Sequence, residues 1–188
     1  MFFLGTPNKE FAKIEEKEHP LTKWMSKTVQ SLPSFNPSVK HLVVMVGSPA
    51  SGKSFYSRDL EKKGFLRINK DEMKADKVQQ KAFNTGLKEG QNIVIDNTNS
   101  TKESRAKWIN EAKEASYNIT IVWMNFPMHV VEFLDNYRVY INKNQDTHVP
   151  AVAMRVYYKK FEKPMQEECD NLIEINTINK EDMLSVWL

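Results

Sequence analysis

The sequence predicts an α/β fold, a parallel sheet of about five strands with helices on both faces. Short β-branched apolar runs alternate along the chain with longer segments of helical character. The first run is apolar at nearly every position, as expected of a strand buried on both faces of a parallel sheet. A glycine-containing loop follows that run and leads into a helical segment, a usual connection in such folds.

Strands are expected at the apolar runs, over residues 41–46, 65–69, 92–96, 118–125 and 171–176. Helices are expected over residues 54–63, 71–87, 100–115, 128–142 and 151–161, with a loop at 144–150 before the last one. The helix over 71–87 is closed by Lys88-Glu89-Gly90, a common helix stop. Ser100 is expected to cap the next helix, with Glu103 as its capping-box partner.

Residues 1–38 differ in composition from the rest of the chain. Charged residues are dense there, and prolines recur at Pro20, Pro33 and Pro37. Residues 32–37 are typical of an extended linker. The sequence therefore predicts an N-terminal extension over 1–38, which packs on a main domain over 39–188 and cannot form a core alone.

Composition is that of a soluble globular protein, with 40% hydrophobic and 27% charged residues among 188. The net charge of +3 permits a polyanionic partner but does not require one. A single cysteine, Cys169, excludes an internal disulfide and a cysteine-based zinc site. No apolar run approaches the length of a membrane span, so we expect an intracellular protein, cytoplasmic or nuclear, without a membrane partner.

A phosphate-binding motif follows the first strand. Gly47-Ser48-Pro49-Ala50-Ser51-Gly52-Lys53-Ser54 matches G-x-x-x-x-G-K-[ST] in full. In this motif the backbone N–H groups bind phosphate, the lysine reaches the β- and γ-phosphates, and the serine binds Mg²⁺. The strand before and the helix after it argue against a chance match. The sequence therefore predicts a P-loop NTPase that uses ATP and Mg²⁺, with Lys53 catalytic and Ser54 a metal ligand.

Asp71 follows the second strand, at the edge where the carboxyl ends of parallel strands meet. A carboxylate there can accept the proton of an attacking hydroxyl and align it with the γ-phosphate. An alternative is that Asp71 only caps the following helix. Lys70, beside it, is a candidate contact for a substrate phosphate.

Asp96, Asn97 and Asn99 form a polar rim after the third strand. A carboxylate at this place commonly holds Mg²⁺, directly or through water, and the rim can bind substrate. A turn rich in Asx residues is the alternative. Arg105, one turn into the next helix, can point back to the rim or be a solvated helix charge. Arg138 can reach the triphosphate from a closing lid or pair with Asp135 at the surface.

In its motifs the chain resembles the kinase domain of bifunctional polynucleotide kinase 3′-phosphatases. The likeness runs from about residue 33 to about 176. It includes the P-loop, Asn69-Lys70-Asp71, Ile95-Asp96-Asn97-Thr98-Asn99, Ser104-Arg105-Ala106, Asn136-Tyr137-Arg138, His148-Val149-Pro150 and Tyr157-Tyr158-Lys159-Lys160-Phe161-Glu162-Lys163-Pro164. The P-loop is shared by many enzymes, whereas the Phe-Glu-Lys-Pro ending in this order is the most specific element.

This resemblance implies a nucleoside-monophosphate-kinase-like fold and a set of residue roles. Asp71 matches the general base, Asp96 and Arg105 match residues of the acceptor and metal region, and Arg138 matches a lid arginine. Two positions depart from the family. Lys70 replaces an arginine, which loses bidentate phosphate binding, and Tyr140 replaces a second lid arginine.

The resemblance implies ATP-dependent phosphorylation of the 5′-hydroxyl of a DNA or RNA end, as in nucleic acid end repair. The phosphatase signature Asp-x-Asp-x-Thr is absent from the 188 residues, so no 3′-phosphatase activity is expected. A P-loop kinase of a sugar or sugar acid would share Asp71 and the phosphate-binding loop over 47–54, which we call the cradle. A nucleotide-gated binding module would share only the cradle. The sequence does not fix the oligomeric state or the choice between DNA and RNA.

Overall fold

The computed structural model describes residues 35–36, 38–142 and 147–176. The chain divides into two units, one over Ser34–Asn176 and one made of Met1–Pro33 and Thr177–Leu188. Everything below concerns the first unit. The expected extension over residues 1–38 and its linker lie largely outside the described residues, as do residues 144–146 of the expected loop over 144–150, and the boundary at residue 38 stays a prediction.

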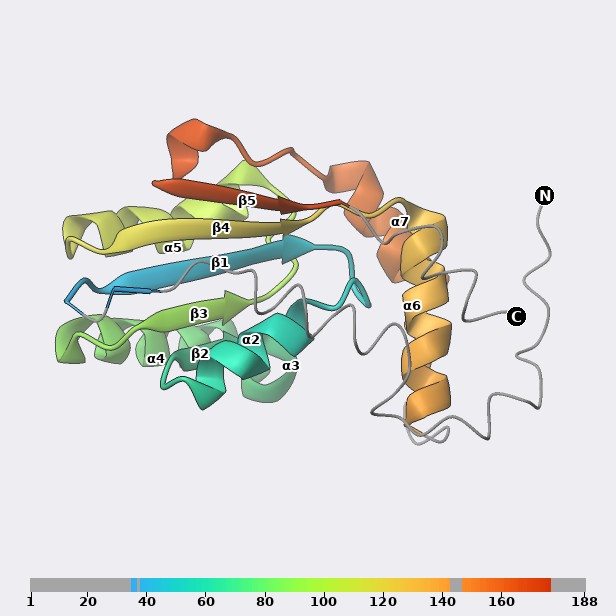
Figure 1. The fold of residues 1–188 in the computed structure, drawn as a ribbon, viewed down its shortest axis with the longest axis horizontal. Coiled ribbons are helices and arrows are strands. Elements are labelled where there is room, and N and C mark those ends of the chain that lie inside the picture. Colours follow the sequence, from blue (N-terminus) through green and yellow to red (C-terminus); the bar gives the residue numbers. More distant parts are fainter. Residues whose placement is uncertain (1–34, 37, 143–146, 177–188) are drawn as a thin grey trace. The chain divides into compact units, whose positions relative to one another are not determined.

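The described unit is built on a five-stranded parallel sheet, as the sequence predicts (Figure 1). Its strands are β1 (His41–Gly47), β2 (Leu66–Asn69), β3 (Ile93–Asp96), β4 (Asn118–Met124) and β5 (Asn171–Ile175). They lie in the order β2-β3-β1-β4-β5, so the first strand is central. Every residue of β1 is buried, which accounts for its uninterrupted apolar run.

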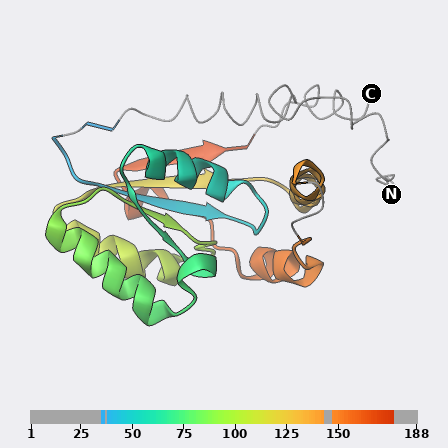
Figure 2. The same ribbon diagram turned by 90° about the horizontal axis from the view of Figure 1, so that it is seen from below.

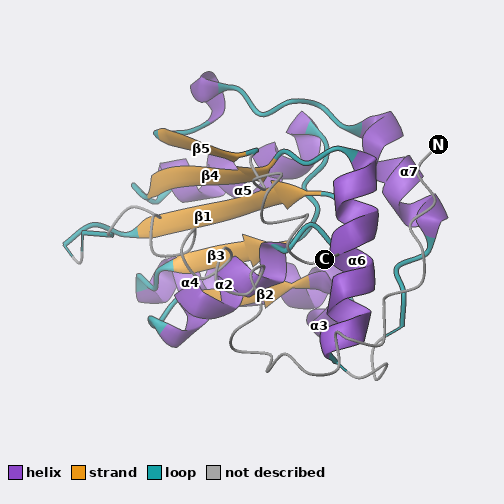
Figure 3. Ribbon diagram, turned by 45° about the vertical axis from the view of Figure 1, so that its right-hand side comes forward, coloured by secondary structure: helices purple, strands orange, loops and turns teal. Residues whose placement is uncertain are grey.

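Helices cover both faces of the sheet, as predicted. The helices are α2 (Lys53–Lys62), α3 (Lys70–Met73), α4 (Asp76–Glu89), α5 (Lys102–Glu114), α6 (Met128–Ile141), α7 (Ala151–Lys160) and the 3₁₀ turn η3 (Gln166–Glu168). Figure 2 shows α2 on one face, and α4 with α5 on the other. In Figure 3, α6 stands beyond the carboxyl ends of the strands. None of the helices within the described ranges combines the length and apolarity needed to cross a membrane.

The main core lies between the sheet and the α4–α5 layer. Leu42 and Val44 of β1 pack there with Phe83 of α4 and Trp108 of α5. The rings of Phe83 and Trp108 meet edge to face, with centroids 5.0 Å apart. Such aromatic pairs stabilise a core beyond the area they bury. The central strand is therefore held firmly, and its carboxyl end carries the phosphate-binding loop.

The predicted helix over 71–87 is in fact two helices. Lys74 has φ 54° and Ala75 is extended, which separates α3 from α4. No glycine or proline marks this break in the sequence. The four-residue α3 is thereby set apart from α4, and it carries Asp71 at the end of β2.

The cap of α5 also differs from the prediction by one residue. Thr101, not Ser100, is the N-cap, and it forms a capping box with Ser104 in which each side chain accepts from the other residue's backbone N–H at 3.2 Å. The Ser100 carbonyl instead accepts from the backbone N–H of Glu162 at 2.8 Å. A tertiary contact thus selects between two adjacent residues that could both cap the helix.

Candidate active site

The phosphate-binding loop joins the central strand to α2. Gly52, the N-cap of α2, has φ 89°, a left-handed conformation that a side chain would strain. A Cβ at Gly47 would lie 2.6 Å from Ser51 Oγ and 2.9 Å from Met124 Cβ, so only glycine fits there. The first turn of α2 has no side-chain cap and no acidic residue. Its N–H groups and positive dipole end therefore remain available to an anion.

Lys53 is buried and folded back over this loop. Its Nζ donates to the Ser48 carbonyl at 2.7 Å. Burial lowers the pKa of Lys53 from 10.5 to about 8, and the charges of Asp96 and Asp71 oppose that shift. The ammonium is therefore poorly solvated, and no carboxylate in the described ranges pairs with it directly. Phosphate oxygens would supply the missing charge, as the P-loop lysine does in nucleotide binding.

The residues expected to hold Mg²⁺ fit that ion. Asp96 is buried, and its Oδ1 accepts no hydrogen bond. Ser54, at the start of α2, is partly exposed. No three His, Cys, Asp or Glu side chains gather as a metal cluster in the described parts of the chain. Proteins usually hold Mg²⁺ by one or two oxygen ligands together with water and substrate phosphates, and Ser54 and Asp96 offer such oxygens.

Asp71 is not the cap of its helix. Asn69 is the N-cap of α3, and its Oδ1 accepts from the backbone N–H groups of Asp71 at 2.9 Å and Glu72 at 3.1 Å. The Asp71 side chain lies at an exposed position, and its charge acts on the buried Lys53. The cap alternative is therefore wrong. Asp71 carries a solvent-accessible carboxylate close enough to the phosphate-binding lysine to influence its pKa.

Arg67 is a residue near the site that sequence reasoning missed. It comes from β2 and is buried, and its guanidinium binds Asp96 of β3 and Glu72 of α3. The only sequence signal is one arginine inside an otherwise apolar strand segment. A buried charge of this kind requires a partner, and this one could have been suspected on that ground.

The polar rim after β3 mainly holds the backbone together. The Asn97 side chain accepts from the Lys70 backbone N–H at 2.9 Å. Asn99 is buried, and its Nδ2 donates to the Met45 carbonyl of β1 at 2.7 Å. The expected substrate contact through Asn99 is thus not available in this arrangement. The Lys70 side chain is exposed and remains able to meet a substrate phosphate.

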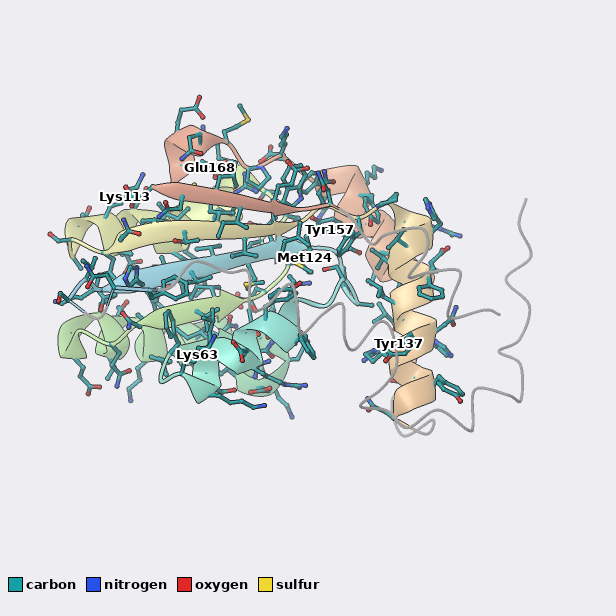
Figure 4. All side chains as sticks on the ribbon, viewed as in Figure 1. Lys63, Lys113, Met124, Tyr137, Tyr157 and Glu168 are labelled. Atoms are coloured by element: carbon teal, nitrogen blue, oxygen red, sulfur yellow. The ribbon has the colours of Figure 1, made fainter. Side chains whose placement is uncertain are left out.

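Arg105 does not point to the rim. It is fully buried, and its Nε and Nη2 donate to the two carboxylate oxygens of Glu168 at 2.7 and 2.9 Å. Its Nη1 donates to the carbonyls of Asn99 and Glu162. Figure 4 shows Glu168 in the η3 turn outside the sheet. The structure therefore corrects both readings of Arg105, as a substrate contact and as a solvated helix charge, because the guanidinium joins four parts of the fold.

Arg138 lies on α6 and forms the ion pair that was the alternative to a lid role. Its Nη2 donates to Asp135 Oδ1 and to the Thr147 carbonyl, both at 2.8 Å. Asp135 also contacts His148 Nδ1 at 3.0 Å and accepts from the Val149 backbone N–H at 3.2 Å. This cluster ties α6 to the segment before α7. The lid role of Arg138 stays a prediction.

Two curated relatives are similar to the chain over more than two thirds of its length. A protein of Acanthamoeba polyphaga mimivirus that carries the name bifunctional polynucleotide phosphatase/kinase is 33% identical over 146 residues, 77% of this chain and 34% of that protein. A bifunctional polynucleotide phosphatase/kinase of Schizosaccharomyces pombe is 34% identical over 130 residues, 69% of this chain and 31% of that protein. The chain thus spans about a third of the length of these relatives. The resemblance predicted from the sequence is confirmed.

Solved structures of the same fold are more distant in sequence. Chaetomium thermophilum Kti12, solved with ADP-AlF₃, superposes with a TM-score of 0.55 at 15% identity, covering 78% of this chain and 95% of that one. A fungal RNA kinase superposes with a TM-score of 0.54 at 14% identity, covering 79% and 42%. These likenesses establish an α/β P-loop fold, which the sequence predicts, and they do not select an acceptor.

A family model described as an AAA domain matches residues 42–164, from β1 through the Phe-Glu-Lys-Pro segment. It includes the whole phosphate-binding loop and the acceptor edge built by β2, β3 and α3. The nucleotide-binding interpretation of the loop is thereby supported at the level of the family. Since the match covers more than half of the 188 residues, the chain belongs to the AAA domain family.

Proposed function

We propose that the chain is an ATP-dependent polynucleotide 5′-hydroxyl kinase, which transfers the γ-phosphate of ATP to the 5′-OH of a DNA or RNA end. The observation that carries the kinase activity is the position of Asp71, and the similarity to polynucleotide phosphatase/kinases supports the polynucleotide acceptor. The Asp71 carboxylate is exposed, is not used as a helix cap, and acts electrostatically on the buried Lys53 of the phosphate cradle. A base beside a triphosphate site is what a kinase needs and a nucleotide switch does not.

The transfer requires positioning and charge neutralisation more than covalent chemistry. Asp71 orients the 5′-hydroxyl and accepts its proton, while a bond forms between the hydroxyl oxygen and the γ-phosphorus. The bond from that phosphorus to the β–γ bridging oxygen breaks, and ADP leaves. Lys53 neutralises charge on the phosphates throughout. Arg138 would add a second positive charge once released from Asp135.

Ser54 and Asp96 would hold Mg²⁺, directly or through water. The ion, when bound, neutralises phosphate charge and aligns the β- and γ-phosphates. Asp96 offers the unpartnered oxygen Oδ1 for this purpose. The chain lacks the Asp-x-Asp-x-Thr phosphatase signature, so the proposal includes the kinase reaction and no 3′-phosphatase reaction.

An acceptor panel tests the proposal. The protein is incubated with γ-labelled ATP and either a 5′-OH oligonucleotide, the same strand with a 5′-phosphate, a free nucleoside, or a sugar acid. We expect label only on the 5′-OH strand. Equal labelling of the nucleoside or preference for the sugar acid would favour the small-molecule kinase. ATP binding without transfer to any acceptor would favour the binding module.

A further inference from the structure

We propose that Arg67 is a positioning residue that sets the geometry between the metal-side carboxylate of Asp96 and the acceptor-side helix α3. This inference rests on the proposed function, because it assigns Arg67 a role through the residues proposed to hold Mg²⁺ and to activate the acceptor. Arg67 binds Asp96 directly and is linked to Asp71 through the neighbouring Glu72. Its side chain is 3% exposed and that of Asp96 is 1% exposed, so solvent screens their ion pair little.

Only one side-chain oxygen of Asp96 accepts hydrogen bonds from the described residues. Arg67 donates to Oδ2 from Nε at 2.9 Å and from Nη2 at 2.6 Å, and Asn69 Nδ2 donates to the same oxygen at 3.1 Å. Oδ1 is buried and receives none. Three donors on one oxygen fix the carboxylate in one orientation and leave the other oxygen free for a ligand. Outer contacts of this kind orient metal ligands in proteins.

Arg67 also contacts α3, the helix that carries Asp71. Arg67 Nη1 donates to Glu72 Oε1 at 2.7 Å, and Glu72 is the next residue after Asp71 in α3. Asn69, the cap of α3, also donates to the Asp96 backbone carbonyl at 2.9 Å. The short α3 is therefore tied twice to the end of β3. A shift of Asp96 would move the position of Asp71. Two side chains contact both Asp96 and α3: Asn69 binds the α3 backbone, and Arg67 binds the Glu72 carboxylate.

The geometry requires a guanidinium. Nε and Nη2 reach Asp96 while Nη1 reaches Glu72, so one planar group spans two carboxylates on different elements. The ammonium of a lysine is a single point charge and cannot keep the same directions. Arg67→Lys therefore preserves the buried charge but loses the shared orientation, which makes it the informative variant.

The experiment measures ADP affinity with and without Mg²⁺ for the whole chain, by calorimetry. The increase in ADP affinity that Mg²⁺ produces is expected to fall by about 10- to 100-fold in Arg67→Lys, the range seen for outer contacts of metal ligands. Metal-free ADP affinity should not change, because the cradle is intact. Asp96→Asn sets the scale for loss of the carboxylate itself. Glu168→Gln, which weakens the other buried arginine–carboxylate pair, is the matched control and should lower thermal stability without altering the Mg²⁺ effect.

An unchanged Mg²⁺ effect in Arg67→Lys, beside a reduced one in Asp96→Asn, would overturn the proposal, since Arg67 would then be merely structural. An unchanged effect in both variants would overturn it together with the metal role of Asp96. No acceptor is present in this titration, so its result is independent of whether the chain phosphorylates a 5′-OH strand, which the acceptor panel decides.

A second, exposed variant covers the case in which Arg67→Lys does not fold. The Glu72 side chain is 59% exposed, and Glu72→Gln keeps its size while weakening the bond to Arg67. We expect kcat for the oligonucleotide to fall several-fold while Mg²⁺·ADP affinity is unchanged. A wild-type kcat in this variant would remove the link between Arg67 and α3 and overturn the coupling.

Discussion

The two sides of the candidate site are built differently. The phosphate cradle is one stretch of chain, Gly47 to Ser54, whose shape depends on backbone conformation and on two glycines. The acceptor edge is assembled from β2, β3 and α3, and it depends on side chains held by Arg67 and Asn69. The cradle needs little help from distant residues. The acceptor edge exists only when β3 folds beside β2 and α3, which lie earlier in the sequence.

This difference implies that nucleotide binding and phosphoryl transfer can be separated. Changes in the cradle should remove both, because transfer requires bound nucleotide. Changes on α3 should reduce transfer and leave nucleotide binding intact, whereas changes at Arg67 or Asp96 should also weaken the Mg²⁺-dependent part of ADP binding. Variants on the two sides test this separation. A cradle variant that keeps transfer, or an α3 variant that loses nucleotide binding, would contradict it.

The largest effect is expected for the cradle variant Lys53→Met. It keeps the length of the side chain but lacks the charge, and transfer should fall by roughly 10³-fold or more, the scale of a cationic phosphate contact. ADP affinity should fall as well, as measured by calorimetry. The nucleotide-free protein should unfold at no lower temperature than wild type, because a desolvated cation has been removed. Lys63→Met, on the exposed end of α2, is the control and should behave as wild type in both assays.

Salt is expected to have an intermediate effect, by raising KM for the oligonucleotide at the acceptor edge. If the strand makes about three phosphate contacts, KM for the oligonucleotide should rise roughly 20-fold between 50 and 200 mM salt. Lys70→Gln should reduce the slope by about one contact, since its side chain is exposed beside Asp71. The measurement is KM over a salt series with saturating ATP. A flat response would show that the acceptor is not a polyanion.

A smaller effect is expected for pH at the cradle. The pKa of Lys53 is about 8 without nucleotide, and bound phosphates would raise it. Below pH 8 the ammonium is already charged and ADP affinity should be flat. Above pH 8 binding must take up a proton, so affinity should fall by up to about tenfold per pH unit. Calorimetry at pH 7, 8 and 9 checks this, and Lys53→Met should show no such decline. A rise in wild-type affinity above pH 8 would contradict the assignment.

Much of the fold can be predicted from the sequence because the strands are buried on both faces. Their apolar runs place the observed strands within one residue at each end. The break between α3 and α4 cannot be predicted this way, because Lys74 adopts a positive φ without a glycine or proline to signal it. The α5 cap is ambiguous for a different reason, since Ser100 and Thr101 are adjacent and a contact from Glu162 decides between them.

The parts of the candidate site that can be predicted from the sequence are those whose residues lie close together in the sequence. The cradle is specified by its motif. The place of Asp71 after a strand predicts that it lies at the site, but leaves open whether it acts as a base or as a helix cap. Arg67 and Arg105 show the limit, because each is one arginine in an ordinary segment until its carboxylate partner, 29 or 63 residues away, is known. Its place one turn into the helix, together with the resemblance, predicted a substrate contact for Arg105. Burial and a bidentate pair with Glu168 assign it to the fold.

Single-turnover transfer from γ-labelled ATP in Asp71→Asn tests whether Asp71 is the general base for a 5′-hydroxyl. The variant cannot accept a proton, and α3 keeps its cap because Asn69 supplies it. We predict that the rate on a 5′-OH oligonucleotide falls at least ~10²-fold, within the range of general-base assistance, with ADP affinity and unfolding temperature unchanged. A near-normal rate in Asp71→Asn with the fold intact would contradict the assignment.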